Sequence, residues 1–585
     1  MPETSWREIV AEKRLRQQAT IPKDWVLLNL PPKEQLDVSN VPETCGLLST
    51  KEIEITNSPV EVLLGNMANS VWSSVEVTTA FSKRAIIAHQ LTNCLTEIFI
   101  ERGRKRAEEL DEHLKKTGNV VGPLHGKSVC YTNTLLPNNR QYKGLPMSLK
   151  DQINIKDIES TMGYVSWIGL YAKKNSVLAD ILESLGAVLY VKTNIPQTLM
   201  WPETFNHVFG RTSNPFNRSL TSGGSSGGEG ALIALKGSPL GVGSDIGGSV
   251  RIPGAFNGVY GLRPSYGRIP YAGCVNSLEG QDSILSVLGP LSNSIGGIKS
   301  FVKGVVSQQP WLKDPLAVRK RWSEEEYQLI EHGSGEQLCF GILWDDEVIK
   351  PHPPIFRALQ ETKKALIEAG HKVIDWKPLK HGEIYTVARD IWGAGATEDY
   401  NVTSAPTGEP VIMSMSPEAE KIVANADTPS FRRPPDGISA YELWQVQKKK
   451  RDLRQEYVDY WQASVELTGT GRPVDAVISP SAPFVAPPHG LNTYANYTMI
   501  WNVLDYPALV IPVSKVDQTL DTKQSAHTFY GTEDQANYDL YEPETFKNAP
   551  ISIQVVARTL EEEAVIAMSE IVDKALKERE YASRL

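Results

Sequence analysis

The 585-residue sequence contains few cysteines, no excess of basic residues and no long hydrophobic run. Its five cysteines are odd in number, widely separated and without Cys-x-x-Cys spacing: they are Cys45, Cys94, Cys130, Cys274 and Cys339. This pattern predicts buried or free thiols in a reducing compartment. The net charge of -9 argues against a nucleic-acid partner. No stretch reaches the roughly 18 apolar residues that a membrane span requires, so we expect no such span.

The two ends of the sequence bear on where the protein is located. The first residues, MPETSWREIVAEKRLRQQ, are charged and amphipathic and lack the apolar core of a signal peptide. We therefore expect a soluble, cytoplasmic protein. The last three residues, Ser583-Arg584-Leu585, are a conservative variant of the Ser-Lys-Leu peroxisomal signal, which leaves a peroxisomal location as the alternative.

Helical and strand patterns alternate along most of the chain. Helical periodicity over residues 5–19, 58–68, 74–92 and 100–116 predicts an N-terminal helical layer. From about Leu145, short β-rich runs alternate with helices, which is typical of one large α/β domain with a mixed or parallel sheet. The predicted strands are LPMSLKDQINI, GAVLYVKTN, SPLGVGS, FNGVYGLRP, LCFGILW, HKVIDW, VDAVISPSAP, YPALVIPVS and PISIQVVAR. Residues 400–435, rich in Pro, Ser, Thr and Ala, are predicted to form an irregular surface insertion.

Glycine is concentrated in one stretch. Of the 44 glycines, 13 lie in the 41 residues from Thr221 to Gly261. Because glycine is costly inside helices and strands, such a density indicates backbone that takes positive φ or closely approaches a bound molecule. We expect the chemistry of the protein in this stretch.

Two common motifs do not account for the glycine-rich stretch. Residues 223–227 formally match Gly-x-Ser-x-Gly, but the preceding RTSNPFNRSLTS is turn-forming rather than a strand, and no histidine of the ten stands out as a partner. A phosphate-binding P-loop is excluded because Lys-Ser/Thr does not follow the glycines.

A serine with a lysine base is the better interpretation. Ser249 follows Gly247 and Gly248, where consecutive backbone N–H groups can form a pocket for an oxyanion. Without an obvious histidine base, a buried lysine with a depressed pKa is the usual alternative. The candidate is Lys150, at the end of the strand pattern LPMSL. Taken alone, Lys150 beside Asp151 is more typical of a surface ion pair.

Three segments resemble the signature of the amidase signature family: residues 144–151 (GLPMSLKD), 223–229 (GGSSGGE) and 243–251 (GSDIGGSVR). The similarity extends over nearly the whole chain through STMGY, VKTNIPQTLM, GRTSNP, YGLRPSYGRIPYA, HPPIFRAL and APISIQVVAR, and is nearest to fungal acetamidases and general amidases. The resemblance implies an α/β fold, a single large domain whose central mixed, twisted sheet is covered by helices on both faces. Residues 1–120 would be a helical N-terminal extension packed on the core, and residues 121–585 the catalytic domain.

The resemblance also implies a role for each signature residue. Ser249 would be the nucleophile, Ser225 a bridging serine held by a cis peptide bond, and Lys150 the base that starts the proton relay. The oxyanion hole would be formed by the N–H groups of Ile246, Gly247, Gly248 and Ser249. No metal and no cofactor are implied. Asp245 and Arg251 are expected to fix this loop by a buried pair.

The implied activity is hydrolysis of a short aliphatic or aryl amide, such as acetamide, to carboxylate and ammonia. Its pocket walls are predicted to include Met200, Trp201 and Tyr164 beside Ser225. Three alternatives stay open: a fatty-acid-amide hydrolase, a glutamyl-tRNA amidotransferase subunit, and a catalytically impaired binding protein on the same fold. A small-molecule amide is the expected partner, and a homodimer is an open option.

The sequence departs from the family pattern at residues 127–144. Members of this subgroup typically run from a Pro-Leu-His-Gly-like turn directly into the LPxSLKD strand, whereas here KSVCYTNTLLPNNRQYKG follows Gly126. This polar segment of 18 residues has no amphipathic period and predicts neither helix nor strand. It is interpreted either as a surface loop ahead of the strand that carries Lys150 or as a translated intron, which sequencing of the mature transcript would distinguish.

Overall fold

The computed structural model describes residues 5–118, 144–423 and 437–584. The predicted insert at residues 127–144 lies outside this part of the chain except for Gly144, and so does Cys130. The thiols of Cys45, Cys94, Cys274 and Cys339 are unpaired.

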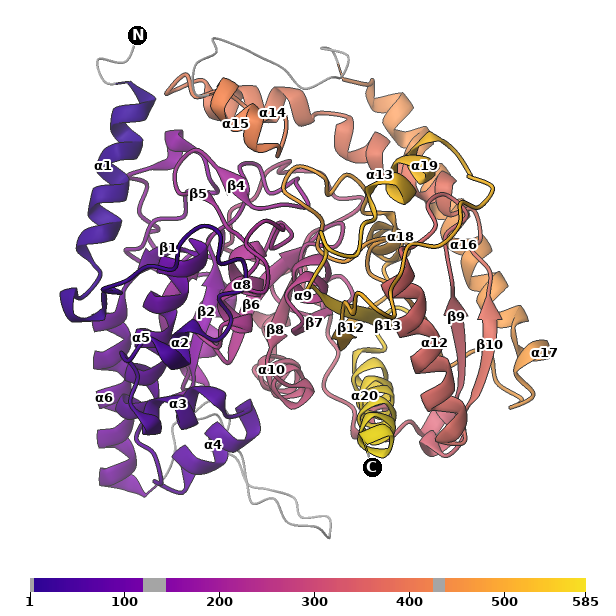
Figure 1. The fold of residues 1–585 in the computed structure, drawn as a ribbon, viewed down its shortest axis with the longest axis horizontal. Coiled ribbons are helices and arrows are strands. Elements are labelled where there is room, and N and C mark those ends of the chain that lie inside the picture. The colour runs from indigo at the N-terminus through magenta and orange to yellow at the C-terminus, as the bar shows by residue number, and fades with distance from the viewer. Residues whose placement is uncertain (1–4, 119–143, 424–436, 585) are drawn as a thin grey trace.

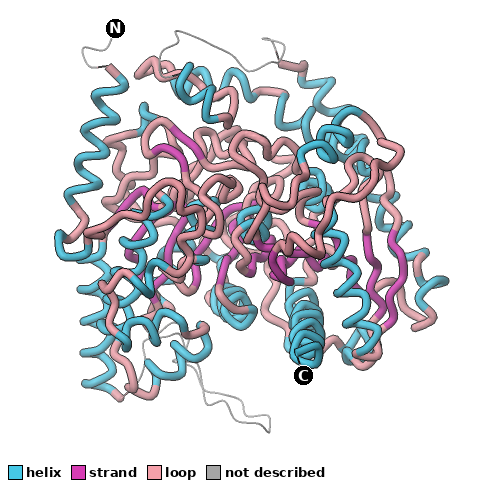
Figure 2. Tube along the Cα trace, viewed as in Figure 1, coloured by secondary structure: helices cyan, strands magenta, loops and turns pink. Residues whose placement is uncertain are grey.

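A single sheet of eleven strands runs through the middle of the molecule (Figures 1 and 2). Its strand order is β1-β3-β2-β6-β8-β7-β12-β13-β11-β9-β10. The strands are β1 (Leu95–Ile98), β2 (Pro146–Lys150), β3 (Val188–Thr193), β6 (Leu240–Asp245), β7 (Tyr260–Arg263), β8 (Val287–Ser292), β9 (Cys339–Leu343), β10 (Lys372–Trp376), β11 (Ala476–Pro480), β12 (Ala508–Lys515) and β13 (Pro550–Val556). All nine predicted strands are confirmed, whereas β1 and β8 were not predicted.

The sheet is mixed, and the part formed by β3, β2, β6 and β8 brings the ends of β2 and β6 together. Strand β2 is parallel to both β3 and β6, with Leu149 paired to Val242, whereas β8 is antiparallel to β6. Parallel neighbours end at the same edge of a sheet. Lys150, the last residue of β2, and Asp245, the last of β6, therefore share one edge.

Helices cover both faces of the sheet, as predicted. On one side, α10 (Ile295–Ser307) and α12 (Pro353–Glu368) both contact α20 (Glu562–Arg584), and α10 and α20 lie below the central strands in Figure 1. On the other side, α8 (Gly227–Ala234) contacts α9 (Arg251–Phe256), and both pack on the central strands. A further group, α13 (His381–Gly393), α16 (Ala440–Ala463) and α18 (Asn496–Leu504), encloses a second apolar core with buried Trp461 and Trp501.

The N-terminal helical layer is confirmed. Its helices are α1 (Trp6–Ala19), α2 (Val41–Thr44), α3 (Thr50–Asn57), α4 (Val60–Ala68), α5 (Ser74–Thr92) and α6 (Ile100–Thr117). Three of them begin at capping boxes, in which Ser5, Ser49 and Ser73 exchange hydrogen bonds with a glutamate three residues later. The same segment contributes β1 to the sheet, where it pairs with β3. The division at residue 120 stays a prediction.

The prediction of an irregular surface insertion at residues 400–435 is wrong for its described part. This region contains α14 (Ala396–Ser404) and α15 (Pro417–Val423), and Tyr400, Glu409, Ile412 and Met415 are buried. Its apolar side chains cover Phe205 and Trp201, which a composition rich in small polar residues does not reveal.

Among the described residues, no helix combines the length and apolar character needed to cross a bilayer.

Helix α8 approaches the sheet so closely that its first turn requires glycine. A Cβ on Gly228 would lie 2.3 Å from the backbone nitrogen of Asn194 and 2.6 Å from the carbonyl oxygen of Cys94. Neither backbone atom can move aside as a flexible side chain would. The start of α8, directly after Ser225 and Ser226, is therefore positioned by a contact that excludes any side chain.

We expect Gly228→Ala to destabilise the protein by about 1–3 kcal/mol, the usual cost of overpacking. Gly65→Ala in α4 is the matched control, because a Cβ there meets no described atom within 4 Å. Since alanine favours helix over glycine, this control should keep or slightly raise stability. Chemical denaturation of both variants measures the difference, and equal stabilities would contradict the close contact.

Candidate active site

Three sequence-predicted residues lie at the shared edge of β2 and β6. Lys150 ends β2, Ser225 lies in the loop that leads into α8, and Ser249 lies between β6 and α9. The Lys150 Nζ is 2.7 Å from the Ser225 Oγ, although 75 residues separate them. The structure thus brings the predicted base and bridging serine into hydrogen-bond contact.

The Lys150 side chain is completely buried, unlike a lysine of a surface ion pair. Its Nζ also lies 2.7 Å from the Ser244 Oγ, and Ser244 in turn donates a hydrogen bond to the Gln152 side chain. Burial lowers the pKa of Lys150 to about 7, although the Asp245 and Glu229 carboxylates act in the opposite direction. A substantial fraction of this amine is therefore neutral near pH 7.

The Asp151 carboxylate accepts hydrogen bonds from groups other than Lys150. It accepts a hydrogen bond of 2.8 Å from the Thr96 hydroxyl and one of 2.9 Å from the Met162 N–H. The surface ion pair with Lys150 that the local sequence favours is therefore absent from the described contacts, because both side chains are buried and bind other groups.

Glu229 is a buried carboxyl group that sequence analysis did not assign. It lies in the first turn of α8 and accepts hydrogen bonds from Ser148 on β2 (2.6 Å) and Thr193 on β3 (2.9 Å). Burial raises the pKa of Glu229 to about 7. The sequence signal that could have identified Glu229 is a carboxylate within a glycine-rich run, because a charged residue buried in such a segment needs hydrogen-bond partners. Glu229 ties the helix after Ser225 to the strand that carries Lys150.

The loops of the two predicted catalytic serines are joined through their backbones. The Gly224–Ser225 peptide bond is cis, as the resemblance implies. The Ser226 N–H donates to the Ser249 carbonyl oxygen at 3.1 Å, and the Ser244 N–H donates to the Ser226 hydroxyl at 3.3 Å. Among the contacts of the described residues, no hydrogen bond joins the Ser249 and Ser225 hydroxyls directly. Ser249 retains 8% exposure, whereas Ser225 retains 1%.

The loop before Ser249 presents free backbone donors. The N–H groups of Ile246, Gly247 and Ser249 make no hydrogen bond to another described residue. Gly248 differs from the prediction, because its N–H is donated to the Asp245 carboxylate at 2.8 Å. Gly248 has φ +132°, and a Cβ on it would lie 2.1 Å from the Thr498 hydroxyl oxygen. Glycine at this position thus serves the shape of the turn, and its neighbours carry the free N–H groups.

A buried ion pair holds this turn, as expected from the sequence. The Arg251 guanidinium forms two hydrogen bonds of 3.0 Å to the Asp245 carboxylate, and both side chains are inaccessible to solvent. Asn502 on α18 donates to the same carboxylate at 2.8 Å. Burial acts to raise the pKa of Asp245, but the charge and hydrogen bonds of Arg251 and Asn502 outweigh it and lower the pKa to about 2. Asp245 is therefore ionised at all physiological pH values.

Ser249 opens into a cavity of about 210 Å³, called here the Ser249 cavity. Met200 and Trp201, the predicted walls of a substrate pocket, line it together with Gly224, Ile246 and Gly247. The other lining residues are Leu199, Pro202, Ser249, Ile252, Tyr385, Arg389, Trp392, Thr493, Ala495 and Met499. Apart from Ser249 and Ile252, these residues lie outside the glycine-rich stretch, and no local pattern marks them.

Tyr164 is not among the residues that line the Ser249 cavity. Its ring is buried with Met162, Ile195 and Leu199, and lies 5.7 Å from the Trp167 ring, measured between centroids. Leu199 also lines the cavity, so Tyr164 supports the wall from behind.

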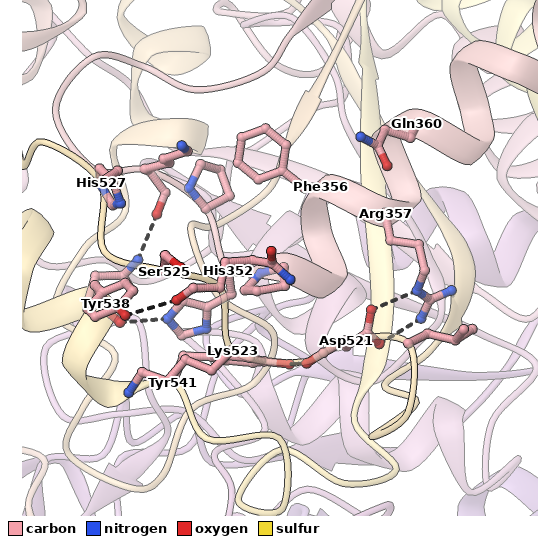
Figure 3. A pocket seen from close by; sticks show the side chains of 16 residues that line it. His352, Phe356, Arg357, Gln360, Asp521, Lys523, Ser525, His527, Tyr538 and Tyr541 are labelled. Carbon is pink, nitrogen blue, oxygen red and sulfur yellow. Dashed lines mark hydrogen bonds and ion pairs between the residues drawn. The ribbon is translucent and has the colours of Figure 1, made fainter.

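A larger cavity of about 560 Å³ lies between the start of α12 and residues 520–541 (Figure 3). Its wall includes Ser525 and His527, and the His527 Nε2 is 2.9 Å from the Asp534 carboxylate. These are the residue types of a Ser-His-Asp triad. However, no hydrogen bond joins Ser525 to His527 in the part of the chain that the structure describes. This cavity therefore lacks the contact between serine and base that Lys150 makes.

The chain is similar to amide-cleaving proteins over nearly its whole length. The family model described as Amidase matches residues 137–566. An acetamidase from Aspergillus oryzae is 39% identical over 578 residues, covering 98% of this chain and 100% of the relative. An acetamidase from Emericella nidulans is also 39% identical, covering 98% and 99%. Among solved structures, a fatty acid amide hydrolase superposes with a TM-score of 0.85 at 31% identity, covering 97% of this chain and 95% of that one.

We expect Asp245→Asn to destabilise the protein by roughly 3 kcal/mol or more, because it leaves the buried Arg251 charge without a counter-ion. Asp452→Asn is the control, since Asp452 forms an exposed pair with Lys448. Loss of this exposed ion pair should leave the midpoint of thermal unfolding unchanged. A similar small shift for both variants would contradict the structural role of the buried pair.

Proposed function

The chain belongs to the amidase family and is an amidase that acts on amide C–N bonds, and on that premise we propose that it works through an acyl-serine intermediate. Ser249 is the nucleophile, Ser225 the bridge and Lys150 the base. The observation that carries this proposal is the 2.7 Å contact between the Lys150 Nζ and the Ser225 Oγ. The buried amine has its pKa lowered to about 7, which suits a base at neutral pH.

The proton relay runs from Ser249 to Lys150. Neutral Lys150 accepts the Ser225 hydroxyl proton, Ser225 accepts the Ser249 proton, and the Ser249 oxygen attacks the amide carbonyl carbon. This step requires the Ser249 hydroxyl to turn toward Ser225 when substrate is bound, since catalytic hydrogen bonds often form only in that complex. The N–H groups of Ile246, Gly247 and Ser249 are suited to stabilise the developing oxyanion.

Collapse of the tetrahedral intermediate completes the reaction. The proton returns from Lys150 through Ser225 to the leaving nitrogen, the C–N bond breaks, and ammonia departs. Water then attacks the acyl-serine carbonyl, with the same relay accepting its proton, and the carboxylate is released as the Ser249 hydroxyl is restored. The relay thus serves as base and acid in both half-reactions.

The proposed substrate is a short aliphatic or aryl amide. The Ser249 cavity, about 210 Å³ with mainly apolar walls, is smaller than the roughly 300–1,000 Å³ of sites for drug-sized ligands. The 39% identity to two fungal acetamidases supports the same choice. A long-chain amide is the second candidate, favoured by the TM-score of 0.85 to a fatty acid amide hydrolase. Rates on acetamide, hexanamide, benzamide and oleamide discriminate between the two.

We expect Ser249→Ala and Lys150→Ala each to lower kcat/KM for benzamide by at least about 10²–10⁴-fold, because each removes a group from the relay. Released ammonia measures turnover, and the thermal unfolding midpoint of each variant shows whether the fold is kept. Near-normal turnover by either variant would refute the assignment and would favour a different serine or a different base.

The pH dependence of kcat/KM should follow the Lys150 amine. Because only the neutral amine is a base, kcat/KM should rise about tenfold per pH unit below pH 7 and level off above it. Glu229, whose own pKa is about 7, is partly ionised at this inflection, so Glu229→Gln removes a partial charge that raises the Lys150 pKa and should move the inflection to slightly lower pH. Lys150→Arg, which cannot lose its proton, should be inactive throughout. A flat wild-type profile from pH 5 to 9, or an inflection that Glu229→Gln leaves in place, would contradict this assignment.

A further inference from the structure

One face of helix α13 forms part of the Ser249 cavity. Tyr385, Arg389 and Trp392 all line it, and their spacing of four and three residues places them on the same side of the helix. Of these three residues, Trp392 packs against the loop before Ser249, because a Cβ built on Gly247 would be 3.2 Å from the Trp392 ring. From Trp392, this helix face runs back through Arg389 to Tyr385.

Arg389 is the one charged side chain among the described residues that line the Ser249 cavity. The residue is exposed, which places its charge at the cavity's mouth rather than its floor. The Arg389 Cζ lies 5.5 Å from the Tyr385 ring centroid, a cation–π contact between the guanidinium and the tyrosine ring. The guanidinium is thus held beside a tyrosine of the cavity wall.

We propose that Arg389 determines substrate specificity by favouring amides that carry a carboxylate about one aromatic ring away from the scissile carbonyl. The helical rise places the Arg389 backbone about 4.5 Å along the helix from Trp392, which packs on the oxyanion loop. An aryl group between the apolar walls would therefore bring a carboxylate in its para position toward the guanidinium, whose planar donors match carboxylate geometry. This inference rests on the proposed amide hydrolysis and refines its substrate class.

The experiment compares two substrates of the same shape, 4-carbamoylbenzoate and neutral 4-nitrobenzamide. The ratio of kcat/KM for 4-carbamoylbenzoate to kcat/KM for 4-nitrobenzamide should be about fivefold to tenfold higher in wild type than in Arg389→Gln at low salt. At high salt, which screens the charge, this difference should shrink. The ratio between the substrates removes differences in intrinsic reactivity, as in a double-mutant cycle. Because the contact is equal in ground and transition states, the loss should appear in KM rather than kcat.

Two further variants serve as controls. Arg389→Lys keeps the charge and should retain part of the preference. Arg104→Gln removes an equal charge from a solvent-exposed position on α6, outside the cavity wall, and should leave the preference unchanged. If Arg389→Gln shows the wild-type ratio while both substrates are hydrolysed, the specificity role is refuted and the amidase mechanism stands. If wild type hydrolyses neither substrate, the aryl-amide proposal and this inference fail together.

Discussion

The proposed active site depends on keeping the Lys150 amine inside the protein, away from solvent. Burial disfavours the charged form of Lys150, whereas the nearby Asp245 and Glu229 carboxylates favour it, and the balance places its pKa near 7. Two hydroxyl groups, from Ser225 and Ser244, provide its hydrogen-bond partners. Without burial the amine would remain protonated at neutral pH, and without these partners its desolvation would be uncompensated. The strands and helices around Lys150 provide both its burial and its hydrogen-bond partners.

The sheet and helix α8 create that environment together. Parallel β2 and β6 place Lys150 and Asp245 at one edge, and α8 brings Ser225 onto the same edge by packing against the backbone around Asn194. Glu229 fastens the first turn of α8 to both β2 and β3. Small displacements of α8 would therefore alter the contact between serine and lysine, which explains why glycine rather than alanine is needed at its closest approach.

Electrostatics divides the site into a fixed part and an open part. The Asp245–Arg251 pair is completely buried and holds the turn before Ser249 through backbone and side-chain hydrogen bonds. The cavity in front of Ser249 is mainly apolar, with its charge confined to Arg389 at the mouth. Buried charges thus hold the turn before Ser249, while the cavity walls are uncharged except for Arg389.

The sequence by itself determined the family, the α/β fold class, nine of the strands and the signature residues Lys150, Ser225 and Ser249, because these depend on local periodicity and on three contiguous motifs. It missed β1 and β8, and it misjudged the helices near residue 400, because tertiary burial overrides local composition. Only the tertiary structure decided that Lys150 is buried rather than paired with Asp151, that Gly248 donates to Asp245, and that Tyr164 stands behind the cavity wall. The physical reason is that the burial of Lys150, the cavity wall and the contacts of Asn502 with the Asp245–Arg251 pair arise from residues 75 to more than 250 positions apart in sequence, which no local pattern connects.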